Sequence, residues 1–271
     1  MPFGISNQPP PFGAERAGQP STQGIFQRLS SGKRINSAKD DAAGLAISEN
    51  LSAQIRSLEA ATANTTRGLS ILRTAEGGTG AISDVTSRLR ELAVQSADGG
   101  LSDTDRAAID AEAQQLLEEI DRTAESTEFN GQELLAGSEQ NVELQVGSGT
   151  TADNRIAVTT GGIGTESLGL DTVDLSTAEG AQAAIGAIDA AQSTVSERRA
   201  TLGAQSNRLE RAAENLTSQR NSLAATNSRI RDADFAKETA DLAGSLVRKQ
   251  AQISIRAQAN GSNSLALRLL Q

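Results

Sequence analysis

The sequence contains no cysteine, histidine, tryptophan or tyrosine, and aromatic residues make up only 2% of it. Without cysteine the chain has neither disulfide nor thiolate chemistry. Without histidine it lacks the usual base for a nucleophile and any H-E-x-x-H zinc motif. It also has no run of 18 apolar residues, so no segment is expected to span a membrane. We therefore expect no catalytic residues, no metal site and no cofactor.

Charge is distributed unevenly around a formal net value of −9. Acidic side chains are in excess over residues 41–230, whereas residues 1–40 and 231–271 carry slightly more basic ones. A nucleic-acid-binding protein needs a basic stripe to neutralise phosphates, and a membrane-surface helix needs a Lys/Arg-rich polar face. Neither is present, so we expect neither partner. The acidic middle is explained by a solvated helical surface or, alternatively, by ends that bury together while the middle faces water.

The most regular pattern is an apolar column with a period of seven residues. Its members are Ile188, Val195, Leu202, Leu209, Leu216, Leu223 and Ile230. A heptad repeat of this length without proline predicts one long helix, from about Thr177 to about Arg231, lying along a partner helix. The positions three residues further on are mostly small or polar, which favours a bundle over a two-stranded zipper.

Another helical half precedes this one and opens after Asp40-Asp41, where we expect the carboxylates to cap the helix start. Near Gly77–Gly80 its large apolar residues slip in register by one position. Glycine weakens a helix by about 1 kcal/mol relative to alanine, so either a local bend or a continuous helix that tolerates the glycines is expected. A further helix starts at the capping box of Ser102–Asp105, and Asn130-Gly131 predicts a turn.

Between the two halves, apolar and polar residues alternate in two short runs, 142–146 and 156–158. This predicts a β-hairpin at about 141–160. After Asp232–Asp234 a final amphipathic helix is expected, and it leaves an apolar chain end that favours burial in an assembly. All five prolines lie in the first 20 residues. Because interior proline costs a helix about 3 kcal/mol, we expect residues 1–20 to be extended or disordered and helix to begin near Ser21.

Two strings near the ends resemble a known family. The string LSSGKRINSAKDDAAGLAIS (Leu29–Ser48) closely resembles the N-terminal signature of bacterial flagellin, the subunit of the flagellar filament. The string SRIRDADFA (Ser228–Ala236) resembles that family's C-terminal signature. Agreement continues at Arg90–Gln95, at Phe129–Gly131 and at Gln258–Asn260. The resemblance covers about residues 25–135 and 180–271.

The resemblance implies a mainly α fold, with a long antiparallel helical rod or coiled-coil bundle, a small β-hairpin region and paired terminal helices. Residues 1–43 plus 231–271 would form the inner filament-core domain, and residues 44–230 the rod-like domain. The chain would be a short form without large central surface domains. One departure from the family is the proline-rich segment 1–20, because the family's extreme N-terminus is helical.

The implied function is that of a structural subunit, not an enzyme, which self-assembles into the extracellular filament for swimming motility. With no apolar h-region at the N-terminus, export would use the flagellar type III pathway without a cleaved signal. Implied partners are further copies, an export chaperone, and cap or junction proteins. The alternative function is a hook–filament junction protein. The string Ser37–Gly44 is nearer the filament subunit, since junction proteins tend to carry prolines around the Asp pair.

Two sets of surface residues follow. We expect subunit packing by the heptad column and the apolar positions of the final helix: Ile188, Val195, Leu202, Leu209, Leu216, Leu223, Ile230, Phe235, Leu242, Leu246, Ile253 and Leu269. In flagellins with this motif an animal Toll-like receptor contacts residues that align with Arg88, Leu92, Gln95 and Glu112. The resemblance implies the same contact here, whereas sequence physics alone indicates a mixed helix face for subunit packing.

Overall fold

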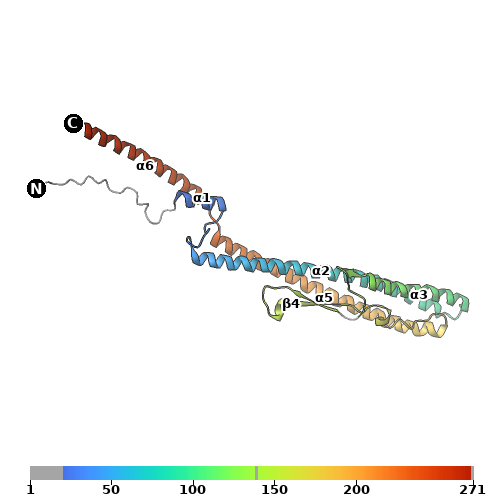
Figure 1. Ribbon diagram of the computed structural model, residues 1–271. Helices are drawn as coiled ribbons and strands as arrows, with labels where there is room; N and C mark the ends of the chain where they lie inside the picture. The colour runs from blue at the N-terminus through green and yellow to red at the C-terminus, as the bar shows by residue number, and fades with distance from the viewer. Residues whose placement is uncertain (1–20, 138–139, 270–271) are drawn as a thin grey trace. The chain divides into compact units, whose positions relative to one another are not determined.

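The computed structural model describes residues 21–137 and 140–269, without the side chains of Gln140 and of residues 262–269. Contacts divide the chain into unit 1, Met1–Ser52 with Leu223–Gln271, and unit 2, Ala53–Ser222. The described part is mainly α, as predicted (Figure 1). Its elements are α1 (Thr22–Ser31), α2 (Ala42–Ser96), α3 (Asp103–Ser126), β1 (Glu128–Phe129), β2 (Gln132–Glu133), β3 (Gln140–Gln145), η1 (Ala152–Asn154), β4 (Arg155–Thr160), α4 (Thr165–Leu168), α5 (Ala178–Arg231) and α6 (Phe235–Leu269).

Helix α1 begins directly after the proline-rich segment. Ser21 is its N-cap, with extended backbone and a side-chain oxygen that accepts a hydrogen bond from Gly24 N at 3.1 Å. The helix ends at Gly32, which has a φ of 67°, a left-handed conformation that favours glycine after a helix. The predicted start near Ser21 is confirmed. The expectation for residues 1–20 concerns residues outside the described part of the chain.

Helix α2 runs without interruption from Ala42 to Ser96, so the glycines at 77–80 are tolerated and produce no break. Most of its buried residues in 58–96 lie in two columns with a spacing of seven residues, and Ile71 and Leu92 are buried beside them. The columns are Leu58, Thr65, Leu72, Thr79, Thr86 and Ala93, and Ala61, Gly68, Ala75, Ile82, Leu89 and Ser96. The predicted slip in register is therefore wrong. It arose because only large apolar side chains were followed, whereas much of the seam is made of Thr, Ala, Gly and Ser.

The buried threonines of this seam have satisfied hydroxyls. The Oγ1 atoms of Thr65, Thr79 and Thr86 donate to the carbonyl oxygens four residues earlier, at 2.8, 2.7 and 3.0 Å. Such bonding to the helix's own backbone removes the cost of burying the hydroxyl. Threonine therefore fills an apolar seam position in α2.

Helix α5 supplies the opposing side of the core in unit 2. Ile188, Val195, Leu202 and Leu209 of the heptad column lie in one cluster with residues of α2, α3, β3 and β4, and Figure 1 shows the three long helices running lengthwise beside one another in this unit. At Gly68 of α2 an added Cβ would overlap Leu144 of β3 and lie 3.0 Å from Leu209 Cδ1. The absence of a side chain there lets hairpin and helices meet.

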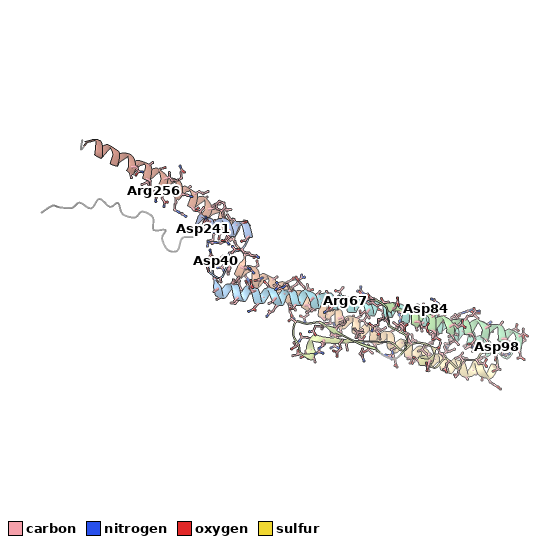
Figure 2. All side chains as sticks on the ribbon, viewed as in Figure 1. Asp40, Arg67, Asp84, Asp98, Asp241 and Arg256 are labelled. Carbon is pink, nitrogen blue, oxygen red and sulfur yellow. The ribbon has the colours of Figure 1, made fainter. Side chains whose placement is uncertain are left out.

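The turn between α2 and α3 is held from both sides. Ser102 and Asp105 form the predicted capping box. Arg106 is buried and donates from Nε to Ser96 O at 3.0 Å and from Nη1 to Leu101 O at 2.6 Å. Its Nη2 donates to the carbonyl of Asp98, a residue of the turn that is labelled in Figure 2. The guanidinium thus pairs with the last backbone carbonyl of α2 and with two carbonyls of the turn that follows it.

Two antiparallel hairpins follow α3. Strands β1 and β2 flank Asn130-Gly131, whose φ angles of 55° and 77° are those of the predicted tight turn. Strands β3 and β4 pair with Leu144 opposite Ile156, and the inward side chains of both strands join the helical core. The hairpin predicted at about 141–160 is confirmed.

Candidate subunit interface

Helices α1 and α6 pack against each other within unit 1. Ile25 of α1 is buried, and Arg28 Nη1 lies 2.9 Å from Glu238 Oε1, whose side chain is only 7% exposed. Lys33 forms a β-bridge with Asp232. Lys33, just after α1, pairs with Asp232, just before α6, whereas Arg28, earlier in the chain, pairs with Glu238, later in α6. The two helices therefore run antiparallel. The pair is held by one buried apolar residue and one largely buried ion pair.

The two signature strings meet at the start of this helix pair. Ala233 N donates to Gly32 O at 3.0 Å, and Arg34 N donates to Arg231 O at 2.6 Å. The guanidinium of Arg34 adds a bond from Nη2 to Ile230 O at 2.7 Å. Segments almost 200 positions apart in the sequence are therefore joined chiefly by backbone groups, and the two signatures form one structural element.

Asp40 and Asp41 act as caps, as expected from their place before α2. Asp41 Oδ1 accepts from Gly44 N at 2.8 Å, which makes Asp41 the N-cap. Asp40 Oδ2 accepts from Ser37 N and Ser37 Oγ, both at 3.0 Å, in the preceding loop, where Figure 2 labels it. These hydrogen bonds lower the pKa of Asp40 below its usual range. The two carboxylates serve different turns and do not form a joint site.

Large apolar side chains are exposed on several elements of unit 1. On α6 the exposed fractions run from 49% for Leu246 to 69% for Val247. Among the side chains of unit 1 that the structure describes, the large exposed apolar ones are Phe26, Ile47, Phe235, Leu246, Val247, Ile253 and Ile255. Three of these, Phe235, Leu246 and Ile253, belong to the predicted packing set. Leu242 is half-buried, and the side chain of Leu269 lies outside the described part.

The heptad column of α5 requires a correction. Ile188, Val195, Leu202, Leu209 and Leu216 are buried inside the chain itself, and Leu223 and Ile230 are half-buried. The five buried side chains have no surface left for a second copy in this conformation. The expectation that they pack between subunits is wrong for them, because their partner helix lies in the same chain.

The four residues aligned with receptor contacts divide into two groups. Arg88, Gln95 and Glu112 are exposed, and Arg88 Nη2 lies 2.8 Å from Glu112 Oε1. Hydrogen bonds to Glu112 and Glu91 raise the pKa of Arg88 above its usual range. Leu92, in contrast, is only 1% exposed and belongs to the core of unit 2. Its expected direct contact with a receptor is contradicted, because the side chain faces inward.

Sequence reasoning missed several exposed apolar residues: Phe26, Ile47, Val94, Val247 and Ile255. Helical periodicity did not identify them, because they lie next to, and not on, the apolar positions that the periodicity picks out, as Val247 does after Leu246. It also missed Arg106, since an arginine in the first turns of a helix usually indicates a solvated position.

Within residues 21–137 and 140–269 no group of three His, Cys, Asp or Glu side chains is placed to hold a metal ion. In that same part of the chain no helix combines the length and apolarity that a bilayer crossing requires. The residues described above form exposed apolar surfaces and helix caps.

Comparison with known proteins bears on these surfaces. Residues 16–140 match the bacterial flagellin N-terminal helical region, and residues 185–270 match the bacterial flagellin C-terminal helical region. The chain is 42% identical over 249 residues to a flagellin of Halalkalibacterium halodurans, covering 92% of each protein. It is 40% identical over 256 residues to the flagellar filament core protein flaB2 of Brachyspira hyodysenteriae, covering 90% of each.

A solved structure is similar as well. The crystal structure of Bacillus cereus flagellin matches with a TM-score of 0.51 and 35% sequence identity, over 61% of this chain and 94% of that one. Fold, sequence and the meeting of the two end strings thus point to the same class of protein.

Proposed function

The chain belongs to the bacterial flagellin family and is a structural subunit of the flagellar filament, the extracellular part of the flagellum, and from this premise we propose that copies associate through the exposed apolar side chains of unit 1. As a member of a structural family it is not an enzyme. The alternative of a hook–filament junction protein is not favoured, because the relatives that match over nine-tenths of the chain are named as filament proteins.

The exposed apolar side chains of α6 carry this proposal. Leu246, Val247, Ile253 and Ile255 are about half to two-thirds exposed, although burying such a side chain fully contributes about 1.5–3 kcal/mol. Leu246 and Ile253 are seven residues apart and so lie on the same side of the helix. Exposed apolar groups that gather on one side typically indicate an interaction surface. Docking of a second copy supplies the missing apolar neighbours.

The inner and outer domains of the filament remain a proposal for this chain. We assign residues 1–43 with 231–271 to the filament core and residues 44–230 to the rod. Support comes from the α1–α6 pair and from the backbone bonds that join residues 32–34 to 230–233. We further propose that the chain ends complete their folding on docking, since assembly supplies apolar partners to them.

Replacing Ile253 by serine tests the α6 surface. We expect polymerisation of the full chain to require a higher critical concentration, by about tenfold for each 1.4 kcal/mol lost at the contacts. Gln252→Ser is the matched control, because Gln252 is exposed on the same helix without an apolar side chain. Sedimentation measures both variants. Equal critical concentrations for Ile253→Ser and the control would reject α6 as the docking surface.

Before assembly the exposed apolar side chains of α6 need a binding partner in the cell that keeps them out of water. We propose that a flagellar export chaperone binds them, that the chain leaves through the flagellar type III pathway without a cleaved signal, and that cap and junction proteins receive it. Co-purification of the chaperone with the full chain should be weaker for Ile253→Ser than for Gln252→Ser. Retention of an N-terminal peptide in secreted protein, read by mass spectrometry, tests the uncleaved route.

We also propose that an animal Toll-like receptor recognises free monomer through Arg88, Gln95 and Glu112. Their exposure supports this, whereas Leu92 would act only by shaping the core beneath them. Arg88→Ala should weaken activation of receptor-bearing cells, and Arg122→Ala, which removes an exposed arginine elsewhere on α3, should not. Purified monomer that activates no such cells refutes the proposal.

A further inference from the structure

Unit 2 contains a small, partly enclosed cavity where the end of β4 meets α2 and α5. Its volume is about 10 Å³. Side chains and backbone of these residues line it: Thr79, Leu135, Thr159, Thr160, Gly161, Ile163, Arg198, Thr201 and Leu202. A cavity needs about 10–15 Å³ of such space to hold one water molecule, so this cavity matches a single water in size. Whether such a space is wet depends on its polar groups, because apolar cavities of protein interiors stay dry.

One polar group at this cavity is buried without a partner in the protein. Thr160 is 3% exposed, and among the residues that the structure describes its Oγ1 has no hydrogen-bond partner. Its neighbour Thr159 differs, because Thr159 Oγ1 donates to Asn141 Oδ1 at 2.7 Å. A buried hydroxyl without a partner costs about 1–3 kcal/mol, and most such groups in proteins are satisfied by protein or ordered water.

The other threonines that line the cavity are complementary to this hydroxyl. Thr79 Oγ1 donates its hydrogen to Ala75 O at 2.7 Å, and Thr201 Oγ1 donates to Glu197 O at 2.9 Å. Both oxygens therefore face any further partner as acceptors only. Thr160, with no carbonyl to take its hydrogen, is able to donate. Arg198 lines the cavity as well, and Thr201 is an exposed residue. For the three threonine hydroxyls, a molecule that accepts one hydrogen bond and donates two is the match.

We propose that one ordered water molecule binds in this cavity, accepting from Thr160 Oγ1 and donating to Thr79 Oγ1 and Thr201 Oγ1. Three partners is the usual number for a buried water. The water joins the end of β4 to α2 and α5, so it fixes the hairpin on the helices at a point where no direct side-chain bond from Thr160 does so.

The substitution Thr160→Val distinguishes a wet from a dry cavity by the sign of its effect. Valine keeps the shape of threonine and removes only the hydroxyl. If the water is bound, the substitution removes one of its three hydrogen-bond partners. We then expect the melting temperature of the full-length monomer to fall by about 2–4 °C. In a dry cavity the variant removes an unsatisfied hydroxyl, and the melting temperature rises or stays unchanged.

Thr159→Val is the matched control, since it makes the same chemical change one residue earlier in β4 at a hydroxyl that is already bonded to Asn141. We expect a smaller effect there. Water–protein cross-relaxation in NMR spectra of the full chain provides a direct measurement, with a long-lived water signal at the Thr160 methyl group. A melting temperature of Thr160→Val that is unchanged or raised, or a spectrum without that signal, overturns the proposal.

Discussion

Units 1 and 2 treat their apolar residues in opposite ways. Among the described residues of unit 1, only Ile25 and Ile35 are buried hydrophobic side chains, whereas Phe26, Phe235 and the α6 set remain exposed. In the described part of unit 2 nearly all large apolar side chains join one core, and Val94 is the one that is exposed. The apolar side chains of unit 2 are therefore covered within the unit, while the described part of unit 1 leaves several large apolar side chains exposed to water.

The polar interactions show a related difference. In unit 2 buried polar groups secure the ends of elements, as Arg106 does at the end of α2 and Ser96 does through its hydroxyl bond to Leu175 O at 2.6 Å. In unit 1 the main side-chain link between α1 and α6 is the pair of Arg28 and Glu238. Unit 1 thus depends on few contacts, which is typical of segments with low local stability.

The strongest test of this contrast compares one leucine from the core with one isoleucine from the surface. Leu209→Ala, at a fully buried position of unit 2, should lower the free energy of unfolding by about 2–5 kcal/mol because it leaves a cavity. Ile253→Ala in α6 should change it by less than about 0.5 kcal/mol. Urea unfolding of the monomer measures both. Similar losses for the two variants would remove the distinction between the units.

A pair of glycines in α2 sharpens the account of the unit 2 core. Gly68→Ala should destabilise by about 1–3 kcal/mol through overpacking, because its Cβ would overlap Leu144. Gly77→Ala meets nothing within 4 Å, so it should stabilise by about 0.5–1 kcal/mol through helix propensity. Thermal unfolding followed by circular dichroism separates them. Stabilisation by both substitutions would show that hairpin and helices do not meet at Gly68.

The ion pair of unit 1 provides the next test. Arg28→Ala leaves the largely buried carboxylate of Glu238 without its charged partner, which should cost about 1–3 kcal/mol locally. Arg122→Ala breaks an exposed pair with Glu119 and should cost about 0–1 kcal/mol. Hydrogen exchange should quicken in α1 for Arg28→Ala and stay unchanged there for Arg122→Ala. Unaltered α1 exchange in both variants would contradict the role of this pair.

The smallest expected effect is the dependence of the stability of unit 2 on acidic pH. Hydrogen bonds from Ser102 lower the pKa of Asp105, and the bond from Arg90 lowers that of Asp189, both in unit 2. A carboxyl with a lowered pKa in the folded state contributes stability above its unfolded pKa of about 4 and loses it as the pH falls through the folded value. The groups are exposed, so the loss should be small.

Urea unfolding of unit 2 at pH 5 and pH 3 measures this dependence, and Asp105→Asn should reduce its slope. If the free energy of unfolding increased on acidification, these carboxyl groups would bind protons more tightly in the folded than in the unfolded chain. That result would contradict the direction of both pKa shifts.

Much of the fold was predictable from local patterns. The capping box at Ser102, the turn at Asn130-Gly131 and the limits of α5 all depend on neighbours within a few positions, and each is confirmed. The seam of α2 was not, because Thr65, Gly68 and Thr79 do not look apolar in sequence. The threonines suit buried positions because their hydroxyls bond to backbone carbonyls of α2, and Gly68 suits one because side chains of β3 and α5 pack against it.

The candidate interface was predictable in part for a similar reason. Helical periodicity identifies an apolar stripe but not the molecule that covers it, so Leu209 and Ile253 were grouped together although one faces the chain's own core and the other faces solvent. Leu92 was placed on a surface by alignment, and its burial followed only from the packing of α2 in unit 2.

Helix lengths, caps and hairpin register follow from the order of residues along this chain, because hydrogen bonds and turn conformations act between positions a few residues apart. Which apolar column is satisfied within the chain and which is left for a neighbour was decided by tertiary packing, because burial is a sum over contacts from segments far apart in sequence. That division, between a filled core in unit 2 and exposed apolar side chains on α6, is the basis of the proposal that α6 packs against another copy in the filament.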